Sequence, residues 1–456
     1  MLTNLNWLHA GAVYPPVAEQ ERINQYKLNE QLFLTKHAEA WKDAFIAISK
    51  RYRKKHFGVE TIFNYQRHLS IKTADFVCGE PPTLETEGDT DTLVKLLDRQ
   101  LFNVRLYEAV IDVSRYGNGI FKIVGNKLTA VSPIYWFPIV APADLKTITQ
   151  HVIAYPISPD DKGVMTELYV EIHNIGSIEQ RTYSYDGLKN EIVKIKEEPK
   201  VLKTGLNDFA VQVLTNVTHS GSIYGLDDYT VINSIIQKLM WRIHCIDTVL
   251  DKHSEPSLSG PQSALELDPK TGLYFLNLGN YFKRASNDDP DLKYITWDGN
   301  LAEAYKETEL LLDQLYILSE MGQAFMMGKD NGAADSGTAL KLKLVSPRIK
   351  AARLTGINTA SVKTLISLLA QVNGIAVDYN TISITWNDGL PNDEVEETNR
   401  LNVATGGKAI MSQYAALKSR GLSDADVEAE LEQIREEDAA AAPALLSNID
   451  QNKGTV

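Results

Sequence analysis

The sequence predicts an α+β protein, and three observations support this fold class. Apolar side chains recur at helical spacing through the first hundred residues, a block of short β-prone runs follows, and two long heptad stripes lie beyond that block. The chain has 456 residues, of which 44% are hydrophobic and 23% are charged. This length suggests about three domains, and the composition excludes a wholly disordered chain, a collagen-like fibre and a small disulfide-rich scaffold.

The net charge of −13 argues against a protein that wraps nucleic acid with a basic surface. The two cysteines, Cys78 and Cys245, match no metal or redox spacing, and isolated thiols are typical of a reducing compartment. The N-terminus does not resemble a signal peptide, and no apolar stretch is long enough to cross a bilayer. We therefore expect a soluble, cytoplasmic chain without a membrane segment.

The helical part and the β block follow each other in order. Residues 18–46 have helical spacing and are followed by a basic run, prolines at 81 and 82 end the next element, and residues 91–113 resume the helical pattern. After the turn residues 116–119, short β-prone runs alternate with turn residues over 120–214. This alternation predicts an antiparallel meander that begins with a hairpin around a Gly-Asn turn.

Two heptad stripes predict two long helices. The first comprises Ile232, Ile236, Leu239, Ile243, Ile246 and Leu250, with Asp227 or Asp228 as a candidate cap and Pro256 after its end. The second comprises Leu301, Ala304, Thr308, Leu311, Leu315, Leu318, Gly322 and Phe325. Helices over 228–253 and 301–325, joined by a compact insert at 254–300, most simply pack as an antiparallel pair. Two core helices of an ordinary α+β domain are the alternative.

The last third of the chain has marked differences in charge. A polar loop at 327–336 precedes a helix over 338–373, which carries six lysines and arginines and no acid, with Pro347 predicted to kink it. A strand is expected at 381–386. Residues 393–438 are predicted to be helical and carry 12 Asp and Glu against 5 Lys and Arg. Acids of the second heptad helix could pair with bases of the next segment or with a neighbouring copy.

No catalytic motif is present. Gly406, Gly407 and Lys408 are followed by Ala409, so they do not form a phosphate-binding P-loop. The nine histidines include no His-Glu-x-x-His pair, and no Gly-x-Ser-x-Gly elbow occurs. Adjacent acids at 227–228 and 288–289 could hold magnesium, but acids beside helix starts and turns are more often caps. We predict neither an enzyme nor a cofactor or metal site.

Several short motifs resemble the portal (head–tail connector) proteins of tailed bacteriophages, of the type found in phages of Gram-positive hosts. The resemblance is carried by residues 222–228 (Ser-Ile-Tyr-Gly-Leu-Asp-Asp), by 250–253 with Pro256, by Ala74-Asp75-Phe76 with residues 79–82 (Gly-Glu-Pro-Pro), by 116–119 (Tyr-Gly-Asn-Gly) and by 336–340 (Ser-Gly-Thr-Ala-Leu). The order and spacing of these motifs extend over about residues 22–437.

The resemblance implies a portal-like protomer. Its segments would be a wing at 1–225, with a helical N-terminal part and a β-rich part from about 120, stem helices at 226–253 and 301–326, a small α/β clip at 254–300, a tunnel loop at 327–337, a kinked helix and wing strand at 338–390, a helical crown at 391–438 and a tail at 439–456.

The resemblance also implies partners. About twelve copies would form a ring at one capsid vertex of the virion, assembled in the host cytoplasm, around a channel through which double-stranded DNA is packaged and ejected. Other expected partners are the terminase motor, the head–tail adaptor and the major capsid and scaffolding proteins, with no membrane contact. ATP hydrolysis would belong to the terminase. A metal-dependent DNA-processing enzyme and a non-phage oligomeric α+β binding protein are the alternatives.

Candidate channel residues follow from the same resemblance. A basic lining would hold DNA through counterion release, whereas an acidic lining leaves it mobile. The candidates for lining the stem channel are Glu303, Glu309 and Asp313, and apolar spacing does not decide which of these acids face inward. The tunnel-loop residues nearest the DNA would be Lys329, Asp330, Asn331 and Asp335.

The basic helix over 338–373 has two interpretations. Lys341 and Lys343 could touch DNA, or the helix could dock on an acidic surface of the adjacent subunit. We favour the second, because a ring interface requires charge partners. Lys341, Lys343, Lys350 and Arg353 are then candidate subunit-interface residues.

Overall fold

The computed structural model describes two compact units. One comprises residues 1–333 and 342–389, and the other comprises 334–341 and 390–456. The residues described are 1–51, 61–254, 257–259, 265–276, 293–295, 301–322, 344–387, 402–403, 411–419, 424 and 426–436.

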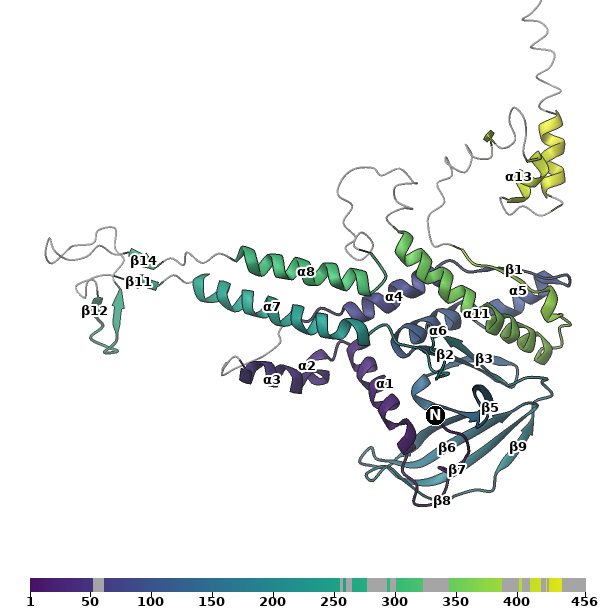
Figure 1. Cartoon of the computed structure of the whole chain (residues 1–456), viewed down its shortest axis with the longest axis horizontal. Coiled ribbons are helices and arrows are strands. Elements are labelled where there is room, and N and C mark those ends of the chain that lie inside the picture. The colour runs from purple at the N-terminus through teal and green to yellow at the C-terminus, as the bar shows by residue number, and fades with distance from the viewer. Residues whose placement is uncertain are drawn as a thin grey trace, which may run out of the picture. The chain divides into compact units, whose positions relative to one another are not determined.

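The N-terminal part of the first unit is helical, as predicted (Figure 1). Its elements are η1 (Val17–Glu19), α1 (Gln20–Phe33), α2 (His37–Ala40), α3 (Lys42–Arg51), α4 (Tyr65–Cys78), α5 (Thr90–Arg99) and α6 (Phe102–Tyr116). Each predicted helical stretch is divided. Thr35 and Leu101 have φ of 66° and 53°, and a residue with left-handed backbone ends a helix, so α1 stops before α2 and α5 before α6.

The predicted meander is confirmed in part, since residues 136–203 form a six-stranded antiparallel sheet. Its strands are β4 (Trp136–Ala141), β5 (Asp144–Pro159), β6 (Met165–Asn174), β7 (Ser177–Asp186), β8 (Glu191–Ile195) and β9 (Lys200–Lys203). Strands β4 to β8 pair antiparallel in chain order, and β9 pairs with β7. The 3-10 turn η2 (Pro133–Tyr135) leads into β4.

The first hairpin of the β block belongs to a second sheet. β2 (Asn118–Val124) and β3 (Lys127–Val131) pair around the predicted Gly-Asn turn, and β10 (Val211–Thr215) pairs with the other edge of β2. The block is therefore two sheets rather than one meander. Lys122 of β2 donates to Glu171 of β6 at 2.8 Å, so a buried ion pair joins the sheets. Burial alone would raise the pKa of Glu171, but hydrogen bonds from His173 and Lys122 lower it to about 2.

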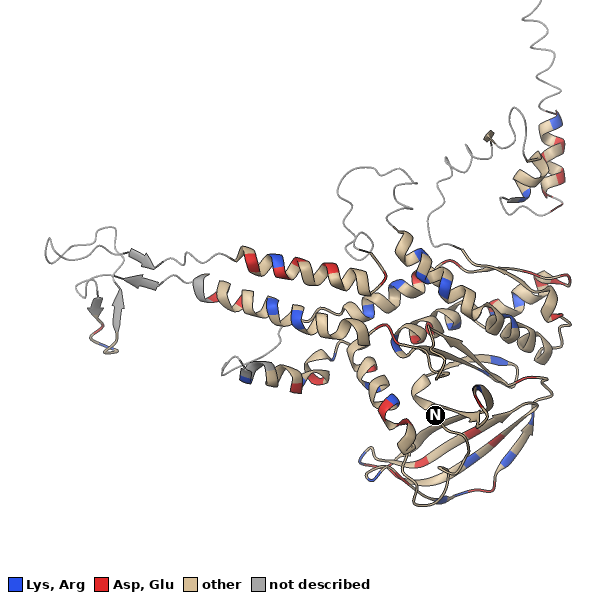
Figure 2. Ribbon diagram, in the orientation of Figure 1, with Lys and Arg blue, Asp and Glu red and all other residues tan. Residues whose placement is uncertain are grey.

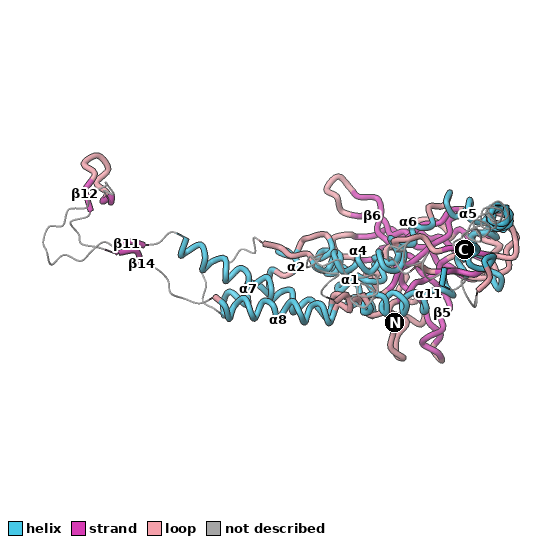
Figure 3. Tube along the Cα trace, turned by 90° about the horizontal axis from the view of Figure 1, so that it is seen from above, coloured by secondary structure: helices cyan, strands magenta, loops and turns pink. Residues whose placement is uncertain are grey.

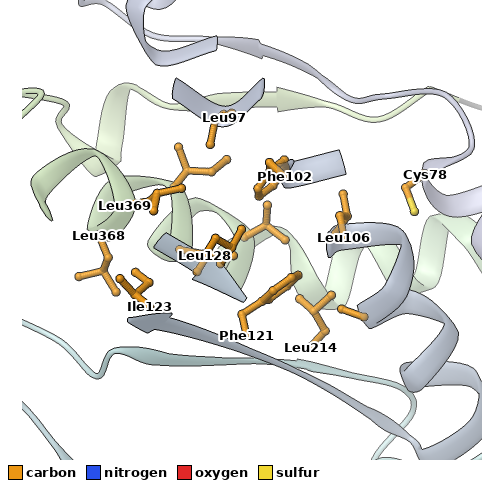
Figure 4. Packing of buried hydrophobic residues seen from close by; sticks show 14 of the residues in the cluster. Cys78, Leu97, Phe102, Leu106, Phe121, Ile123, Leu128, Leu214, Leu368 and Leu369 are labelled. Carbon is orange, nitrogen blue, oxygen red and sulfur yellow. The ribbon is translucent and has the colours of Figure 1, made fainter. Parts of the chain in front are cut away.

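The largest apolar cluster lies between helices and the three-stranded sheet. Figure 4 shows Phe102 and Leu106 of α6 pointing toward Phe121 of β2 and Leu214 of β10. Leu369 closes the cluster from α11 (Val345–Val372). This cluster fixes α6 and α11 on the sheet. Both helices contribute residues to the site described below.

Two long helices follow the sheets, as the heptad stripes predict. α7 (Thr230–Ser254) and α8 (Ala302–Leu318) run side by side in both Figure 1 and Figure 3. Between them in the sequence, β11 (Ser257–Ser259) pairs with β14 (Lys293–Ile295), and β12 (Leu265–Leu267) pairs with β13 (Tyr274–Leu276). α8 ends seven residues before the predicted position, because Glu320 and Gly322 adopt positive φ.

The predicted kink in the basic helix is not observed in the residues described. α11 begins at Val345, so Pro347 lies in its first turn, where a missing backbone N–H costs no helical hydrogen bond. Residues 338–343 of that prediction lie outside the described residues. The predicted strand is confirmed as β15 (Ser383–Thr385), which follows η4 (Tyr379–Thr381) and pairs antiparallel with β1 (Thr83–Glu85).

The second unit is helical where it is described, as predicted for residues 393–438. It contains α13 (Gln413–Ser419) and helical residues 426–436. The side chains of Tyr414 and Lys418 both donate to Asp424, at 2.8 and 2.7 Å, and thereby join the two helical segments. Within the described parts of both units, no helix is long and apolar enough to span a membrane.

Candidate functional site

An apolar cluster holds the α7–α8 helix pair together and attaches it to the N-terminal helices. Ile232, Ile236 and Met240 of α7 are buried against Leu315 and Tyr316 of α8. The same cluster contains Leu32 of α1, Trp41, Phe45 of α3 and Leu69 of α4. The first heptad stripe thus meets the second at the base of the pair, whereas Leu250 near the other end of α7 is exposed.

Ion pairs reinforce the helix pair farther from its base. Lys238 and Arg242 of α7 contact the two carboxylate oxygens of Glu307 on α8, at 3.1 and 2.6 Å. Hydrogen bonds from Lys238 and then Arg242 lower the pKa of Glu307. Glu307 of α8 therefore pairs within its own chain. The sequence alone did not distinguish Glu307 from the other acids of this helix.

The three predicted channel residues lie on the outer face of α8. Glu303, Glu309 and Asp313 are all exposed (Figure 2 shows the acidic positions along α8). Leu310 and Ile317 share this face and are 59% and 65% exposed. Glu303, Leu310 and Ile317 are spaced seven residues apart, so they form one line along the helix. The outer face thus combines apolar and acidic side chains.

At the start of α7, the two adjacent acids Asp227 and Asp228 have different roles. Asp227 caps the helix, because its carboxylate accepts from the backbone N–H groups of Tyr229 and Thr230 at 2.9 and 2.7 Å. Asp228 instead points into the protein and accepts from Lys350 Nζ on α11 at 2.8 Å. Lys350 is only 2% exposed, so this is a buried ion pair between two distant parts of the chain.

A network of hydrogen bonds surrounds that ion pair. Ser114 of α6 and Asn216 also donate to the Asp228 carboxylate, at 2.7 and 3.1 Å. Ser114 accepts from Ser70 of α4, whose hydroxyl also bonds that of Tyr229. Lys350 donates in addition to the backbone carbonyl of Ser319 at 3.4 Å, just beyond α8. We call these seven residues the junction cluster: Ser70, Ser114, Asn216, Asp228, Tyr229, Ser319 and Lys350.

A second charge pair lies beside the junction cluster. The Arg353 guanidinium donates to both carboxylate oxygens of Glu320, one of them at 3.1 Å. The hydroxyl of Ser346 donates to the Glu320 carbonyl at 3.0 Å. These bonds fix the end of α8 against the start of α11. The hydrogen bond from Arg353 also lowers the pKa of the Glu320 carboxyl.

These contacts correct the interface prediction for Lys350, whereas Arg353 is only partly buried and stays a prediction. Both side chains pair with acids of their own chain, and Lys350 is buried, so its charge does not face a neighbouring subunit. The alternative, that acids of the second heptad segment pair with bases of the next one, is confirmed for Glu320 and Arg353. Lys341 and Lys343 lie outside the described residues, as do the loop residues Lys329, Asp330, Asn331 and Asp335.

Two of the short sequence motifs meet at the base of α7. Gly117 follows α6 with φ of 85°, and a Cβ atom built on it would lie 2.0 Å from the carbonyl oxygen of Gly225. The Asn118 side chain accepts from the Gly225 N–H at 3.1 Å. Backbone therefore passes directly over backbone here, which only glycine permits. The contact brings the start of α7 to the end of α6 and so places Asp228 beside Ser114.

The sequence did not predict the junction cluster, and only one weak feature of the sequence pointed to this region. The pair Asp227-Asp228 suggested a cap, and one of the two acids does cap α7. As for a metal-dependent site, the residues that the structure describes contain no group of three or more histidine, cysteine or acidic side chains able to hold an ion.

The family model for SPP1 Gp6-like phage portal proteins matches residues 214–444 of the chain. This range includes α7, α8 and α11. The match covers half of the chain. The chain belongs to this portal family. Its function is accordingly that of a portal, the connector of a phage particle. No curated protein matches the portal chain.

Three of the solved structures that are similar to the portal chain come from gene transfer agent particles. A chain in the virion of the native particle has a TM-score of 0.48 and 12% identity, and one in the neck of the empty particle, computed with C6 symmetry, has 0.48 and 10%. A chain in the neck of the native particle, computed with C12 symmetry, has 0.44 and 12%. Each match covers 78% of this chain and 90% of the other.

Proposed function

We propose that about twelve copies of this portal chain form a closed ring around a channel for double-stranded DNA at one capsid vertex. The observation that carries the proposal is the outer face of α8. Leu310 and Ile317 lie in one line on a helix that is firmly packed on its other side, and both are mostly exposed in a single copy. A line of exposed apolar side chains is typical of a surface that a partner covers, and a repeated head-to-tail contact closes into a ring.

In this proposal the parts of the chain take the roles expected for a portal. α7 and α8 form the stem, the segment between them the clip, residues 1–225 and 338–390 the wing, 327–337 the tunnel loop and 391–438 the crown. The clip would meet the terminase motor and later the head–tail adaptor, and the wing and crown would face the capsid and scaffolding proteins. The chain would act as a passive channel without enzymatic activity, and the terminase would hydrolyse ATP.

The acids of α8 support a channel that does not hold DNA. Glu303, Glu309 and Asp313 are exposed, whereas Glu307 is paired with α7. Exposed carboxylates repel phosphates, so DNA sliding past them breaks few attractive contacts at each step. We propose that Glu303, Glu309 or Asp313 lines the channel and that Lys329, Asp330, Asn331 and Asp335 lie on the loop nearest the DNA.

The ring is tested by native mass spectrometry of the purified chain. We expect assemblies of about twelve or thirteen subunits, and a chain that stays monomeric at high concentration contradicts the ring. The channel residues are tested by packaging assays. Glu309→Lys with Asp313→Lys should reduce DNA uptake, with recovery at higher salt as the added charges are screened. Asp161→Lys, at an exposed turn of the six-stranded sheet, is the control and should package normally.

The tunnel loop has its own test. Lys329→Ala and Asp330→Ala should each alter DNA uptake or retention if these side chains lie nearest the DNA. Unchanged packaging in both variants would contradict the placement of this loop, while leaving the ring and the stem acids untouched.

A further inference from the structure

We propose that the outer face of α8 in one copy docks into an apolar groove at the start of α11 in the next copy. This inference rests on the ring proposed above and names the residues that close it. On α8 the contact is made by the exposed apolar residues of the outer face, Leu310, Ile317 and Leu318. The groove is lined by Phe76, Val345, Arg348, Ile349, Ala351, Ala352, Thr355, Trp386 and Asn387.

The groove is open and mostly apolar. It measures about 360 Å³ and lies between Phe76 of α4, the first three turns of α11 and the residues that follow β15. Ile349, within its lining, is 59% exposed. Farther along α11, Leu354, Val362 and Leu369 are buried in the core. The first turns of α11 thus keep an apolar surface that the core of their own copy does not cover.

The outer face of α8 offers apolar side chains of a suitable kind. Leu310 and Ile317 lie in line along the helix, and Leu318 beside Ile317 is also exposed. The opposite face of α8 is occupied by α7 and the N-terminal helices. Two exposed apolar surfaces, one convex and one concave, are therefore present on each copy, and each can cover the other.

Cyclic symmetry brings these two surfaces to the same level. A rotation about the ring axis moves every residue around the axis without changing its height. Within one copy, Glu320 bonds both Ser346 and Arg353, so the end of α8 lies next to the start of α11. Ile317 and Ile349 consequently have similar heights along any ring axis. The end of α8 in one copy can meet the start of α11 in the next without any axial shift.

Charge favours this pairing over contact between identical faces. The outer face of α8 carries Glu303, Glu309 and Asp313, whereas the groove residues named above include Arg348 and no acid. Two copies of α8 placed face to face would bring like charges together, which is unfavourable. Contact of α8 with the groove of α11 avoids this juxtaposition of acids. The contact is thus head-to-tail, the kind that closes into a ring.

The test is crosslinking between engineered cysteines in the assembled chain. Cys245 is changed to Ser; Cys78 stays, because burial raises the pKa of its thiol to about 12 and keeps it unreactive. Ile317→Cys with Ile349→Cys is then treated with a short bis-maleimide. We expect a ladder of covalent oligomers on a denaturing gel. Mixing the two single variants should give dimers only, because each copy then carries one reactive thiol.

A matched control uses the same helix. Ile317→Cys with Ile357→Cys places the second thiol at another exposed position of α11, outside the groove, and should give no ladder. A pair that crosslinks no better than this control, in chains that native mass spectrometry shows to be rings, contradicts the docking and leaves the ring intact. Dimers of Ile317→Cys alone also contradict it, because they show contact between identical faces. Absence of rings contradicts the proposed function itself.

Charged substitutions give a second readout. Ile317→Asp and Ile349→Asp should each lower the ring fraction at fixed concentration by about tenfold or more, because each removes an apolar side chain from the contact. Both residues are exposed in the single copy, so the thermal unfolding of the monomer should not change. Leu188→Asp, at an exposed turn of the six-stranded sheet, should leave the rings intact. Rings unaffected by the substitutions at 317 and 349 would overturn the inference.

Discussion

The buried ion pair between Asp228 and Lys350 gives the sharpest prediction about stability. In Asp228→Ala the Lys350 ammonium loses a carboxylate at 2.8 Å, and among the residues that the structure describes it keeps the Ser319 carbonyl at 3.4 Å as its one hydrogen-bond partner, while remaining 2% exposed. Ser114 and Asn216 lose their acceptor as well. Removing one partner of a buried pair costs about 3–5 kcal/mol, because the other charge is left without compensation. We therefore expect Asp228→Ala to lower the free energy of unfolding by this amount.

The assay is denaturant unfolding of the full chain at one fixed protein concentration, since assembly itself changes apparent stability. Lys350→Met and the double variant Asp228→Ala with Lys350→Met complete a mutant cycle. The loss in the free energy of unfolding of the double variant should be smaller than the sum of the losses of the two single variants by about 1–3 kcal/mol, because the double variant leaves no unpaired charge.

A control separates buried from exposed charge. Lys196→Met breaks a contact with Glu167 at the surface of the six-stranded sheet and should leave stability unchanged within error. The reasoning is refuted if Asp228→Ala costs less than about 1 kcal/mol or if the cycle is additive, since either result would mean that the pair is not effectively buried.

Three further predictions concern the same framework. Gly117→Ala should destabilise the chain well beyond Gly163→Ala, which also has positive φ but faces open space; equal losses of about 1–2 kcal/mol would show that the backbone contact does not matter. Arg353→Ala should expose the end of α8 to faster amide hydrogen exchange around Glu320 while the sheets exchange normally. Burial lowers the pKa of His151 to about 3, so on acidification the folded state takes up this proton at a lower pH than the unfolded state does. As the pH falls from about 5.5 to about 4, between the unfolded and folded pKa values, this group alone should lower the free energy of unfolding by up to about 1.4 kcal/mol per pH unit. His151→Gln should flatten that slope in denaturant titrations, and an unchanged slope contradicts the burial.

The apolar period of the sequence was sufficient to predict the two long helices. A heptad spacing fixes which side chains share a face, and Ile232, Ile236 and Leu315 lie at the contact accordingly. The end of α8 was placed too late, because the stripe continues through Gly322 while the backbone turns at Glu320. Local backbone conformation is not encoded in apolar spacing, and neither is the division of the β block into two sheets.

The junction cluster was beyond prediction for a different reason. Asp228 and Lys350 are 122 residues apart, and many acids and bases of the sequence could pair at such a distance. The choice depends on the contact of Gly117 with Gly225 and on the packing of α11, both of which arise only in the folded chain. The sequence likewise could not show that Glu307 pairs within the copy while Glu309 and Asp313 remain exposed.

Electron microscopy of the purified chain tests the central claim most directly. We expect closed rings with cyclic symmetry and a central hole, with the α7–α8 helix pairs arranged around it. Particles that remain single copies, or form two-fold dimers without a hole, would contradict the claim that this portal chain closes a channel through the outer face of α8.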